Sequence, residues 1–486
     1  MNYHGNLLDE HILDFEGLLK NHPDLQIGLD DYNINVTANF GEKISSADLW
    51  EKMKRHPRKD ENIHLYFHIP LCSYICKFCS YVKKKLPVGK DSDDVLSQWT
   101  ELLLKESSLY LNSLPWLTHT NVQSFYVGGG TASLLKIEHL QRIISHVKKY
   151  YNIDINCEFS LEGNPDNFLN NELSNAVNIG FNRFSMGVQS FQEEVLKYSG
   201  RQHTNEMSII AIKKLLETNL PFNVDMMFGL PFQTPETVVN DISILTKLKV
   251  PTITIYRLRN ADRHGMGIGN KAVWNNQRIR ENLRQQNVFP SLEETYQMRD
   301  GIVKKLIRNN YHPSPCGWWS LPDTYPNGNI PKVSKNKWQN HETMVAYGPG
   351  AYGWLSGNSQ NIIQTHNITD IAAYAKHMNQ EQTPPLAYGR ILENEQAVAT
   401  VLGFAFKANQ PINIDKINRR FNVQILRQYP YSEVIDDLLS KEFIEISQNR
   451  KFLRPTLKGE ALHEEIISTY IHGKIGDFSN AVCNKI

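Results

Sequence analysis

Short apolar runs alternate with longer helical patterns between about residues 62 and 257. Six runs rich in β-branched and aromatic residues are IHLYFHI, VQSFYVG, CEFSLEG, RFSMGVQ, FNVDMMFG and TITIYRL. Segments with helical periodicity separate them, among them 95–110, 137–151 and 205–217. This alternation is typical of βα units and predicts a parallel sheet. Six units are too few for a closed eight-stranded barrel, so we expect an α/β fold with a partial, curved (β/α)6 barrel.

The same pattern divides the chain into four parts. We expect an N-terminal extension over 1–58, the partial barrel over 59–265, a barrel extension with a lid-like segment over 266–390, and a mainly helical, winged-helix-like C-terminal domain over 391–486. The N-terminal extension is polar, with helical patterns near 8–19 and 46–54. Proline, glycine and tryptophan gather between 313 and 357, where we place the lid. A hairpin pattern before the last helix is the reason for the winged-helix prediction.

Composition narrows the classes of function. The 486 residues are 41% hydrophobic and 21% charged, which is ordinary for a globular protein. The 52 basic and 51 acidic side chains leave a net charge of +1, and no long basic run is present, so we expect no nucleic-acid partner. No run of 18 or more apolar residues occurs, and the start MNYHGNLLDEH lacks the apolar core of a signal peptide. We therefore expect no membrane partner and a cytoplasmic protein.

Polar and glycine-rich peptides follow five of the predicted strands. They are HIPLCSYICKFCS, GGGTASLL, EGNP, GVQSF and FGLPFQT. The carboxyl ends of parallel strands meet on one face of the sheet, where α/β proteins hold their active sites. Turn formation accounts for the glycines and prolines, but not for the cysteines, Glu162, Gln189 and Asp225 at equivalent positions. We therefore expect a single active site at the carboxyl ends of these strands.

Three cysteines form a CxxxCxxC motif directly after the first predicted strand: Cys72, Cys76 and Cys79. Clustered thiols in a chain without a signal peptide indicate metal ligands or catalytic groups rather than disulfides. A structural zinc site and a ferredoxin site both need a fourth ligand, and no second CxxC or HxxxH follows. Three thiolates suit an iron–sulfur cubane with one iron open to a ligand. The remaining cysteines are isolated and are interpreted as inert or buried thiols: Cys157, Cys316 and Cys483.

These peptides together carry a resemblance to a known family. HIPLCSYICKFCS, with Phe78 beside the third cysteine, resembles the radical S-adenosylmethionine (SAM) superfamily. In that superfamily the open iron chelates SAM, and one electron from the cluster cleaves the sulfonium to a 5′-deoxyadenosyl radical. GGGTASLL, EGNP, GVQSFQEEVLKYSGRQHT and VDMMFGLPFQT are similar to the oxygen-independent coproporphyrinogen III oxidase (HemN-like) family. The resemblance covers about 62–257 and continues more weakly in YGPGAYG and TLKG.

The resemblance implies a set of cofactors, site residues and partners. It implies a [4Fe–4S] cluster on the three clustered cysteines, together with one SAM molecule or two. It assigns the SAM contacts to Tyr66, Gly128, Gly129, Gly130, Thr131, Glu162, Gln189, Arg201 and Asp225. Tyr66 and Glu162 are the predicted catalytic residues, since a carboxylate there can pair with the methionine ammonium or a ribose hydroxyl. The expected partners are a small-molecule substrate and an electron donor such as flavodoxin or ferredoxin.

The sequence also departs from the decarboxylase of that family. Tyr81 stands where the decarboxylase has a fourth cysteine, two residues after the third, which disfavours coproporphyrinogen decarboxylation. YRLRNADRHG brings Tyr256, Arg257, Arg259 and Arg263 near the active face, where the arginines are either a carboxylate clamp or solvated loop charges. The leading hypothesis is a radical SAM enzyme that modifies an organic substrate by C-methylation or cyclopropanation, with one SAM molecule or two. The alternatives are a tetrapyrrole enzyme, either a coproporphyrinogen III oxidase or a haem-degrading enzyme, and a haem-carrying chaperone.

Overall fold

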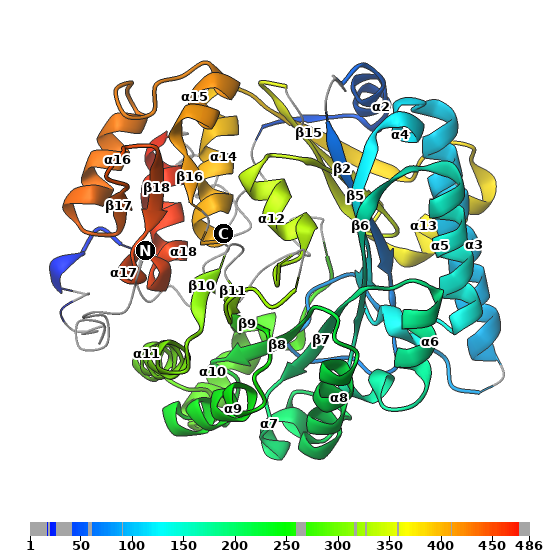
Figure 1. Cartoon of the computed structure of the whole chain (residues 1–486), viewed down its shortest axis with the longest axis horizontal. Coiled ribbons are helices and arrows are strands. Elements are labelled where there is room, and N and C mark those ends of the chain that lie inside the picture. The colour runs from blue at the N-terminus through cyan, green and yellow to red at the C-terminus, as the bar shows by residue number, and fades with distance from the viewer. Residues whose placement is uncertain are drawn as a thin grey trace.

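One large sheet organises the part of the chain that the structure describes (Figure 1). The computed structural model describes residues 17, 20–25, 41–56, 61–89, 91–258, 269–314, 318–325, 328–356, 359–409 and 411–475. Thirteen strands of these residues join in this sheet. The helices of the central part lie along the right and lower sides in Figure 1, and the C-terminal helices, in orange and red, group at the left.

Six consecutive parallel strands form the centre of the sheet, as predicted. They are β2 (Asn62–Ile69), β5 (Asn121–Gly129), β6 (Asn152–Gly163), β7 (Arg183–Gln189), β8 (Phe222–Phe228) and β9 (Thr252–Arg257). The helices between them are α3 (Asp91–Ser113), α4 (Trp116–His119), α5 (Ile137–Tyr150), α6 (Glu172–Ile179), α7 (Glu193–Tyr198), α8 (Asn205–Glu217) and α9 (Pro235–Lys247). The predicted partial barrel is therefore confirmed.

Alternation along each strand separates the core from the interior of the barrel. On β2, Ile63, Leu65 and Phe67 belong to the main hydrophobic core, whereas His64 and Tyr66 point to the opposite face. The same alternation on β5 to β9 directs polar side chains inward and apolar side chains toward the helices. The interior of the partial barrel is therefore polar, and the outer face of its sheet, which packs against the helices, is apolar.

Seven further strands extend the sheet beyond the prediction. At one edge are β12 (Thr343–Tyr347), β13 (Tyr352–Leu355), β14 (Ile362–Asn367), β15 (Leu386–Leu392) and β1 (Glu42–Ile44), and at the other are β11 (Trp318–Ser320) and β10 (His312–Ser314). β12 pairs parallel with β2, and every residue of β12 is buried. The described residues of the 313–357 segment, where the lid is predicted, form strands and α12 (Lys332–Gln339). The apolar run TMVAY is stabilised by joining the sheet.

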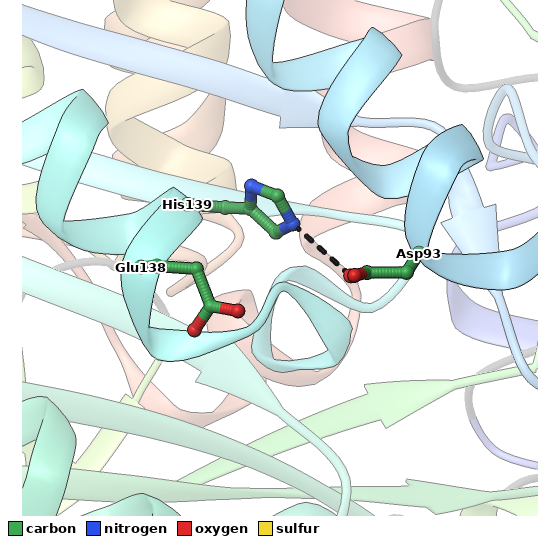
Figure 2. Close-up of side chains that lie close together, drawn as sticks. All are labelled: Asp93, Glu138 and His139. Carbon is green, nitrogen blue, oxygen red and sulfur yellow. Dashed lines mark hydrogen bonds and ion pairs between the residues drawn. The ribbon is translucent and has the colours of Figure 1, made fainter.

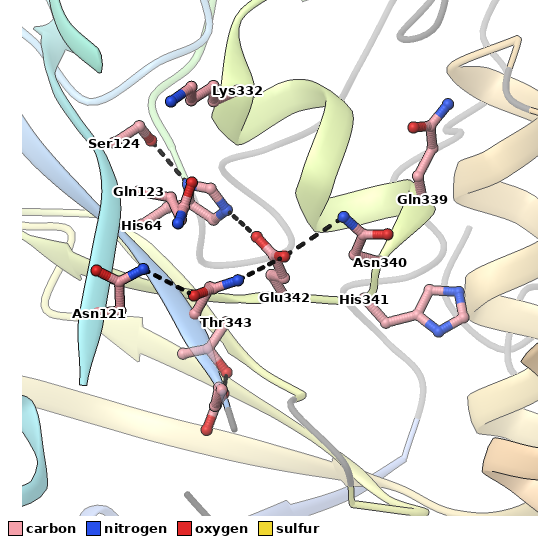
Figure 3. Close-up of polar contacts among 12 residues, drawn as sticks. His64, Asn121, Gln123, Ser124, Lys332, Gln339, Asn340, His341, Glu342 and Thr343 are labelled. Atoms are coloured by element: carbon pink, nitrogen blue, oxygen red, sulfur yellow. Dashed lines mark hydrogen bonds and ion pairs between the residues drawn. The ribbon is translucent and has the colours of Figure 1, made fainter. Parts of the chain in front are cut away.

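A network at the amino ends of β2 and β5 fastens β12 in place (Figure 3). His64 Nδ1 lies 2.7 Å from Ser124 Oγ, and His64 Nε2 lies 2.9 Å from Glu342 Oε2. Asn62 Nδ2 donates to Glu342 Oε1 at 3.3 Å. The serine, histidine and glutamate are arranged like a proton relay, but His64 and Ser124 are 0% and 1% exposed. No substrate can reach them, so this network joins strands.

The C-terminal residues form a unit with its own hydrophobic core. Its elements are α14 (Asn394–Lys407), β16 (Ile412–Asn413), α15 (Ile414–Phe421), α16 (Tyr431–Ser440), β17 (Ile444–Ile446), β18 (Phe452–Pro455), α17 (Leu457–Ala461), α18 (His463–Ile466) and a π-helical turn Ile467–Ile475. The three short strands make one small sheet among these helices. The predicted mainly helical C-terminal domain is confirmed.

The remaining elements join these parts. They are α2 (Ser46–Arg55), β3 (Leu71–Cys72), β4 (Lys84–Lys85), α10 (Gln277–Gln285), α11 (Leu292–Arg308) and α13 (Ile371–Gln380). Asp48 N donates to Ser45 Oγ at 3.1 Å and caps α2, which matches the helix predicted at 46–54. The helix predicted near 8–19 lies largely outside the described residues. In the described part of the chain, no helix combines the length and apolar character that crossing a membrane requires.

Candidate functional site

A cavity of about 480 Å³ lies at the carboxyl ends of the parallel strands. Its size is within the range of small-molecule and cofactor sites. It is lined by Cys72, Cys76, Cys79, Tyr66, Gly129, Gly130, Thr131, Glu162, Gln189, Arg201 and Asp225, among other residues. Of the predicted site residues, only Gly128 is missing from this lining. A Cβ atom on Gly128 would lie 2.4 Å from Glu162 Oε2, so the glycine leaves room for that carboxylate.

The cysteine loop is held by backbone hydrogen bonds on both sides. Lys77 N donates to Ser199 O at 2.9 Å, and Cys79 N donates to Cys76 O at 3.2 Å. Gly130 N donates to Ile69 O at 2.7 Å. A Cβ atom on Gly130 would lie 2.9 Å from Cys72 Sγ, so only glycine lets the second βα turn approach this thiol. The GGG peptide therefore forms one wall of the cluster site.

The electrostatics of the loop suit thiolates bound to a positive centre. Burial raises the pKa of Cys72 to about 12, and it also raises the pKa of Cys79. Arg201 Nη1 lies 3.5 Å from Cys76 Sγ, and Lys83 Nζ donates to Cys79 O. Buried thiols that resist ionisation become thiolates when iron binds them, and the two cations offset the negative charge of the cluster. The three cysteines thus fit an iron–sulfur cubane, which supplies the electron that cleaves SAM when it is bound.

Two buried carboxyl groups face the same cavity. Burial, together with the negative charge of Asp225, raises the pKa of Glu162 to about 7. Burial also raises the pKa of Asp225 to about 6, although Asn223 Nδ2 donates to it at 2.9 Å. Gly129 N donates to Glu162 Oε2 at 3.2 Å. A cationic ligand would allow both groups to ionise, and SAM offers an ammonium and a sulfonium.

Tyr66 is connected to the cysteine loop through His68, which the sequence analysis did not single out. His68 Nε2 donates to Val82 O at 2.9 Å, so His68 Nδ1 accepts from Tyr66 Oη at 3.0 Å. Burial lowers the pKa of His68 to about 4, which keeps the ring neutral and this tautomer in place. The alternation of side chains along β2 could have identified His68, because His68 lies two residues after Tyr66 and therefore faces the same side of the strand.

Gln189 and Arg201 meet at the end of β7. Gln189 has φ 72°, a left-handed conformation that non-glycine residues adopt at a cost, and the β7–β8 register shifts there. Arg201 Nη2 donates to Gly187 O, which places the guanidinium under the cysteine loop. Such strain at a strand end is typical of ligand sites. The structure brings both predicted residues to the cavity.

The cavity has a second wall, of which the sequence analysis placed only Tyr256 near the active face. It is made of aromatic and cationic side chains from elements far apart in the chain: Tyr126, Tyr256, Trp318, Tyr352, Lys83 and Lys337. Three large side chains stay partly open to solvent, since Tyr81, Tyr256 and Tyr352 are 49%, 48% and 37% exposed. No local motif marks Trp318 and Tyr352, because β11 and β13 reach the rim only through long-range strand pairing.

Arg257 is neither the carboxylate clamp nor the solvated loop charge that the sequence left open. Its side chain is 12% exposed and lies 3.5 Å from Glu465 Oε1 on α18. Its guanidinium also stacks over the Tyr296 ring at 5.2 Å. Alternation on β9 explains the correction, because Tyr256 faces the cavity and Arg257 faces the other side. Arg259 and Arg263 lie outside the described residues, as do Cys316 and Cys483.

A second set of possible metal ligands lies on the outside of the barrel (Figure 2). Ligand atoms of Asp93, Glu138 and His139 lie within 4.8 Å of one another. Lys136 Nζ lies 2.8 Å from Asp93 Oδ1, so a side-chain cation already binds that carboxylate. We interpret this group as a surface ion pair between the first turns of α3 and α5.

Comparisons with known proteins agree with the geometry. The sequence profile of the Radical SAM superfamily matches residues 66–245. The heme chaperone HemW of Lactococcus lactis is 25% identical over 409 residues, which cover 84% of this chain and 96% of that protein. Residues 66–245 therefore match the Radical SAM superfamily, and the chain is similar to HemN-like proteins over most of its length. The match to this superfamily implies a [4Fe–4S] cluster and SAM binding.

Other HemN-like relatives match a smaller share of the chain. The anaerobilin synthase of Escherichia coli O157:H7 is 28% identical over 48% of this chain and 51% of that protein. The oxygen-independent coproporphyrinogen III oxidase of Salmonella typhimurium is 25% identical over 46% of this chain and 47% of that protein. The solved structure of the Escherichia coli coproporphyrinogen III oxidase HemN has a TM-score of 0.70 at 18% identity and covers 89% of this chain and 94% of its own. That similarity shows a shared fold.

Proposed function

We propose that this chain is a haem-binding chaperone that carries a radical SAM cluster. The main support from the comparisons is length, because the similarity to the HemW haem chaperones extends over 96% and 98% of two of those proteins. The similarity to anaerobilin synthase, to coproporphyrinogen III oxidase and to three other HemW proteins stops near half of each protein. Over its C-terminal half this chain is similar in sequence to the two chaperones, and its fold also matches HemN over 94% of that chain.

The observation that carries the proposal is the second wall of the cavity. A haem is a flat apolar ring with two carboxylates, so its site needs aromatic faces and a few cations. Tyr256, Trp318 and Tyr352 supply the rings, and Lys83 and Lys337 supply the charges. The partly exposed tyrosines at the mouth leave the ring a path in and out, as a carrier requires.

Tyr81 supports a role other than coproporphyrinogen decarboxylation. It lines the cavity beside Cys79, where the decarboxylase has a cysteine, and it is 49% exposed. The C-methylation and cyclopropanation predicted from the sequence find no support among the relatives, and the tetrapyrrole alternative takes their place. A second SAM molecule stays a prediction, and the haem proposal needs only one.

A tetrapyrrole-modifying radical SAM enzyme is the second candidate. The specific observation in its favour is that Glu162, Gln189 and Arg201 share the cavity with the cysteines. A carrier without SAM chemistry does not need these groups. Bound SAM would then supply a carbon radical within reach of a tetrapyrrole on the aromatic wall.

Product analysis separates the two candidates. Anaerobically reconstituted protein is incubated with haem, SAM and a chemical reductant, and the tetrapyrrole and 5′-deoxyadenosine are quantified. The chaperone proposal expects haem to be recovered intact and to pass to an apo-haemoprotein. Stoichiometric 5′-deoxyadenosine together with a modified tetrapyrrole would establish the enzyme instead. The Cys76→Ala variant, without a complete cluster, is the control for nonenzymatic haem loss.

A further inference from the structure

Two of the three cluster cysteines have a cation beside them, and the two cations differ in burial. Lys83 Nζ donates to Cys79 O, and Lys83 is partly exposed. Arg201 Nη1 lies 3.5 Å from Cys76 Sγ, and Arg201 is 9% exposed. Water screens buried charges less than partly exposed ones, so the charge of Arg201 acts more strongly on the cluster site than that of Lys83.

Backbone and ring contacts hold Arg201 in place beside Cys76. Arg201 Nη2 donates to Gly187 O, and Arg201 N donates to Leu196 O at 2.9 Å. The guanidinium also lies 5.4 Å over the Tyr74 ring, and Tyr74 is 5% exposed. The positive charge is therefore fixed next to the Cys76 thiol.

A carboxyl group follows in the same series of contacts. Tyr74 Oη donates to Asp166 Oδ1 at 3.4 Å. Asp166 belongs to the short helical turn Pro165–Phe168 after β6, and it does not line the cavity. The charges of Asp166 and Arg201 act on each other. The Tyr74 ring thus joins a carboxylate to the cation that lies beside Cys76.

Fixed charges beside an iron–sulfur cluster change its reduction potential. Reduction adds one electron, so the net charge of the cluster becomes more negative by one unit, and no bond or proton changes. A fixed cation stabilises the reduced cluster and raises the potential, whereas a fixed anion lowers it. Arg201 and Asp166 therefore have opposite effects, and that of Arg201 is larger because Arg201 contacts a cluster cysteine directly.

We propose that Arg201 and Asp166 together set the reduction potential of the cluster through Cys76. Arg201 raises the potential, and Asp166 offsets part of this increase. Both effects act in the chain without SAM, so they are separate from the SAM contact that the resemblance assigns to Arg201. The inference rests on the assignment of the cluster to the three cysteines and is independent of haem binding.

Redox titration of the reconstituted full chain tests the two charges against each other. The titration uses titanium(III) citrate at pH 8 without SAM, and electron paramagnetic resonance measures the reduced cluster. Arg201→Met should lower the ratio of reduced to oxidised cluster at a given potential by about 10-fold, which is a shift of about 59 mV to more negative potential for one electron. Asp166→Asn should raise the same ratio by about 3-fold, because it removes a more distant negative charge.

Lys77→Met is the matched control. Lys77 follows Cys76 in the chain, but its Nζ lies 4.1 Å over the Tyr198 ring, so we expect a ratio within about 2-fold of the wild type. Iron analysis verifies that each variant holds a cluster, and if Arg201→Met holds none, the direction of the shift in Asp166→Asn decides the test.

Opposite shifts in the two variants support the proposal. An unchanged potential in Asp166→Asn, or shifts in the same direction in both variants, would overturn it. A wild-type chain that takes up no cluster would overturn the cluster assignment itself. Haem titration of the same variants is a separate readout, so failure here leaves the haem proposal standing.

Discussion

The fold and a bound cofactor favour different protonation states of Glu162 and Asp225. Burial of two carboxyl groups in one cavity favours their protonated forms, whereas a cationic ligand needs them ionised. The folded-state pKa of Glu162, about 7, lies above its ordinary value of 4.5. The stability that the protonated group contributes is fully present below about pH 4.5 and is lost as pH rises through about 7. The chain without SAM therefore becomes less stable over this range.

Glu162→Gln should make the ligand-free chain more stable and weaken its SAM binding. At pH 8 we expect a gain on the order of 1–3 kcal/mol in the free energy of unfolding, because the amide needs no deprotonation. At pH 4.5 the gain should disappear. SAM affinity should fall by about 10- to 150-fold. Urea denaturation at the two pH values and SAM titration measure these effects. Equal stability at both pH values, with unchanged SAM affinity, would remove Glu162 from the site.

Replacing Cys72, Cys76 or Cys79 by alanine should abolish the cluster. Each supplies one of the three thiolates, and no fourth cysteine lines the described part of the cavity. Cys157→Ala is the matched control, since Cys157 is buried on β6 and packs in the main core. Iron analysis and the visible absorbance of reconstituted protein report the result. Loss of the cluster in Cys157→Ala would show that the ligands are misassigned.

The cysteines and glycines of the site could be predicted because each belongs to a short local motif. Gly130 of the GGG peptide, for example, lies directly beside Cys72. Arg257 was misplaced because its partner Glu465 is more than two hundred residues away along the chain. Trp318 of the aromatic wall was missed for the same reason, since it reaches the rim only through the pairing of β11 with β9.

At the scale of elements, a buried carboxylate joins α3 to the turn of the YGPGAYG peptide. Glu106 accepts from Gly348 N at 2.8 Å, from Asn367 Nδ2 at 2.7 Å and from Tyr374 Oη. Gly348 has φ 107°, and a Cβ atom there would lie 2.5 Å from His68 O. The turn therefore packs directly on the end of β2, beside the cluster loop. The sequence showed this peptide as glycine-rich, but it did not show the carboxylate that holds it.

Glu106→Ala should destabilise the fold strongly. It leaves the three donors without their acceptor in a buried position, and we expect a loss of about 3–5 kcal/mol in the free energy of unfolding. Glu101→Ala on the same helix is the matched control, because its exposed ion pair with Arg142 should contribute less than about 1 kcal/mol. Chemical denaturation of both variants checks the difference. A small effect of Glu106→Ala would mean that the turn is held by packing alone.

At the scale of the whole molecule, ion pairs attach the C-terminal unit to the barrel. Arg257 on β9 meets Glu465, and Arg299 on α11 binds Glu460 and donates to Leu457 O at 3.0 Å. The pattern of helices and a hairpin predicted the unit itself. Its placement against β9 and α11 depends on these buried charges, which no periodicity reveals.

Arg257→Met separates a structural role from a ligand clamp. Removal of one partner leaves Glu465 buried without this cation, so we expect a loss of about 3 kcal/mol in stability with unchanged SAM and haem affinity. Arg278→Met, at an exposed position, is the control. Weaker ligand binding without destabilisation would restore the clamp that the sequence suggested.

Haem titration of the anaerobically reconstituted protein, followed by its Soret absorption, tests the central claim most directly. We expect saturable binding of one haem per chain. Ser334→Trp, which fills the cavity from α12, should weaken it at least 10-fold, and Lys335→Trp, on the exposed side of that helix, should not. Melting temperatures of both variants verify that they are folded. The absence of saturable binding, or equal affinity in Ser334→Trp, would contradict a haem site in this cavity.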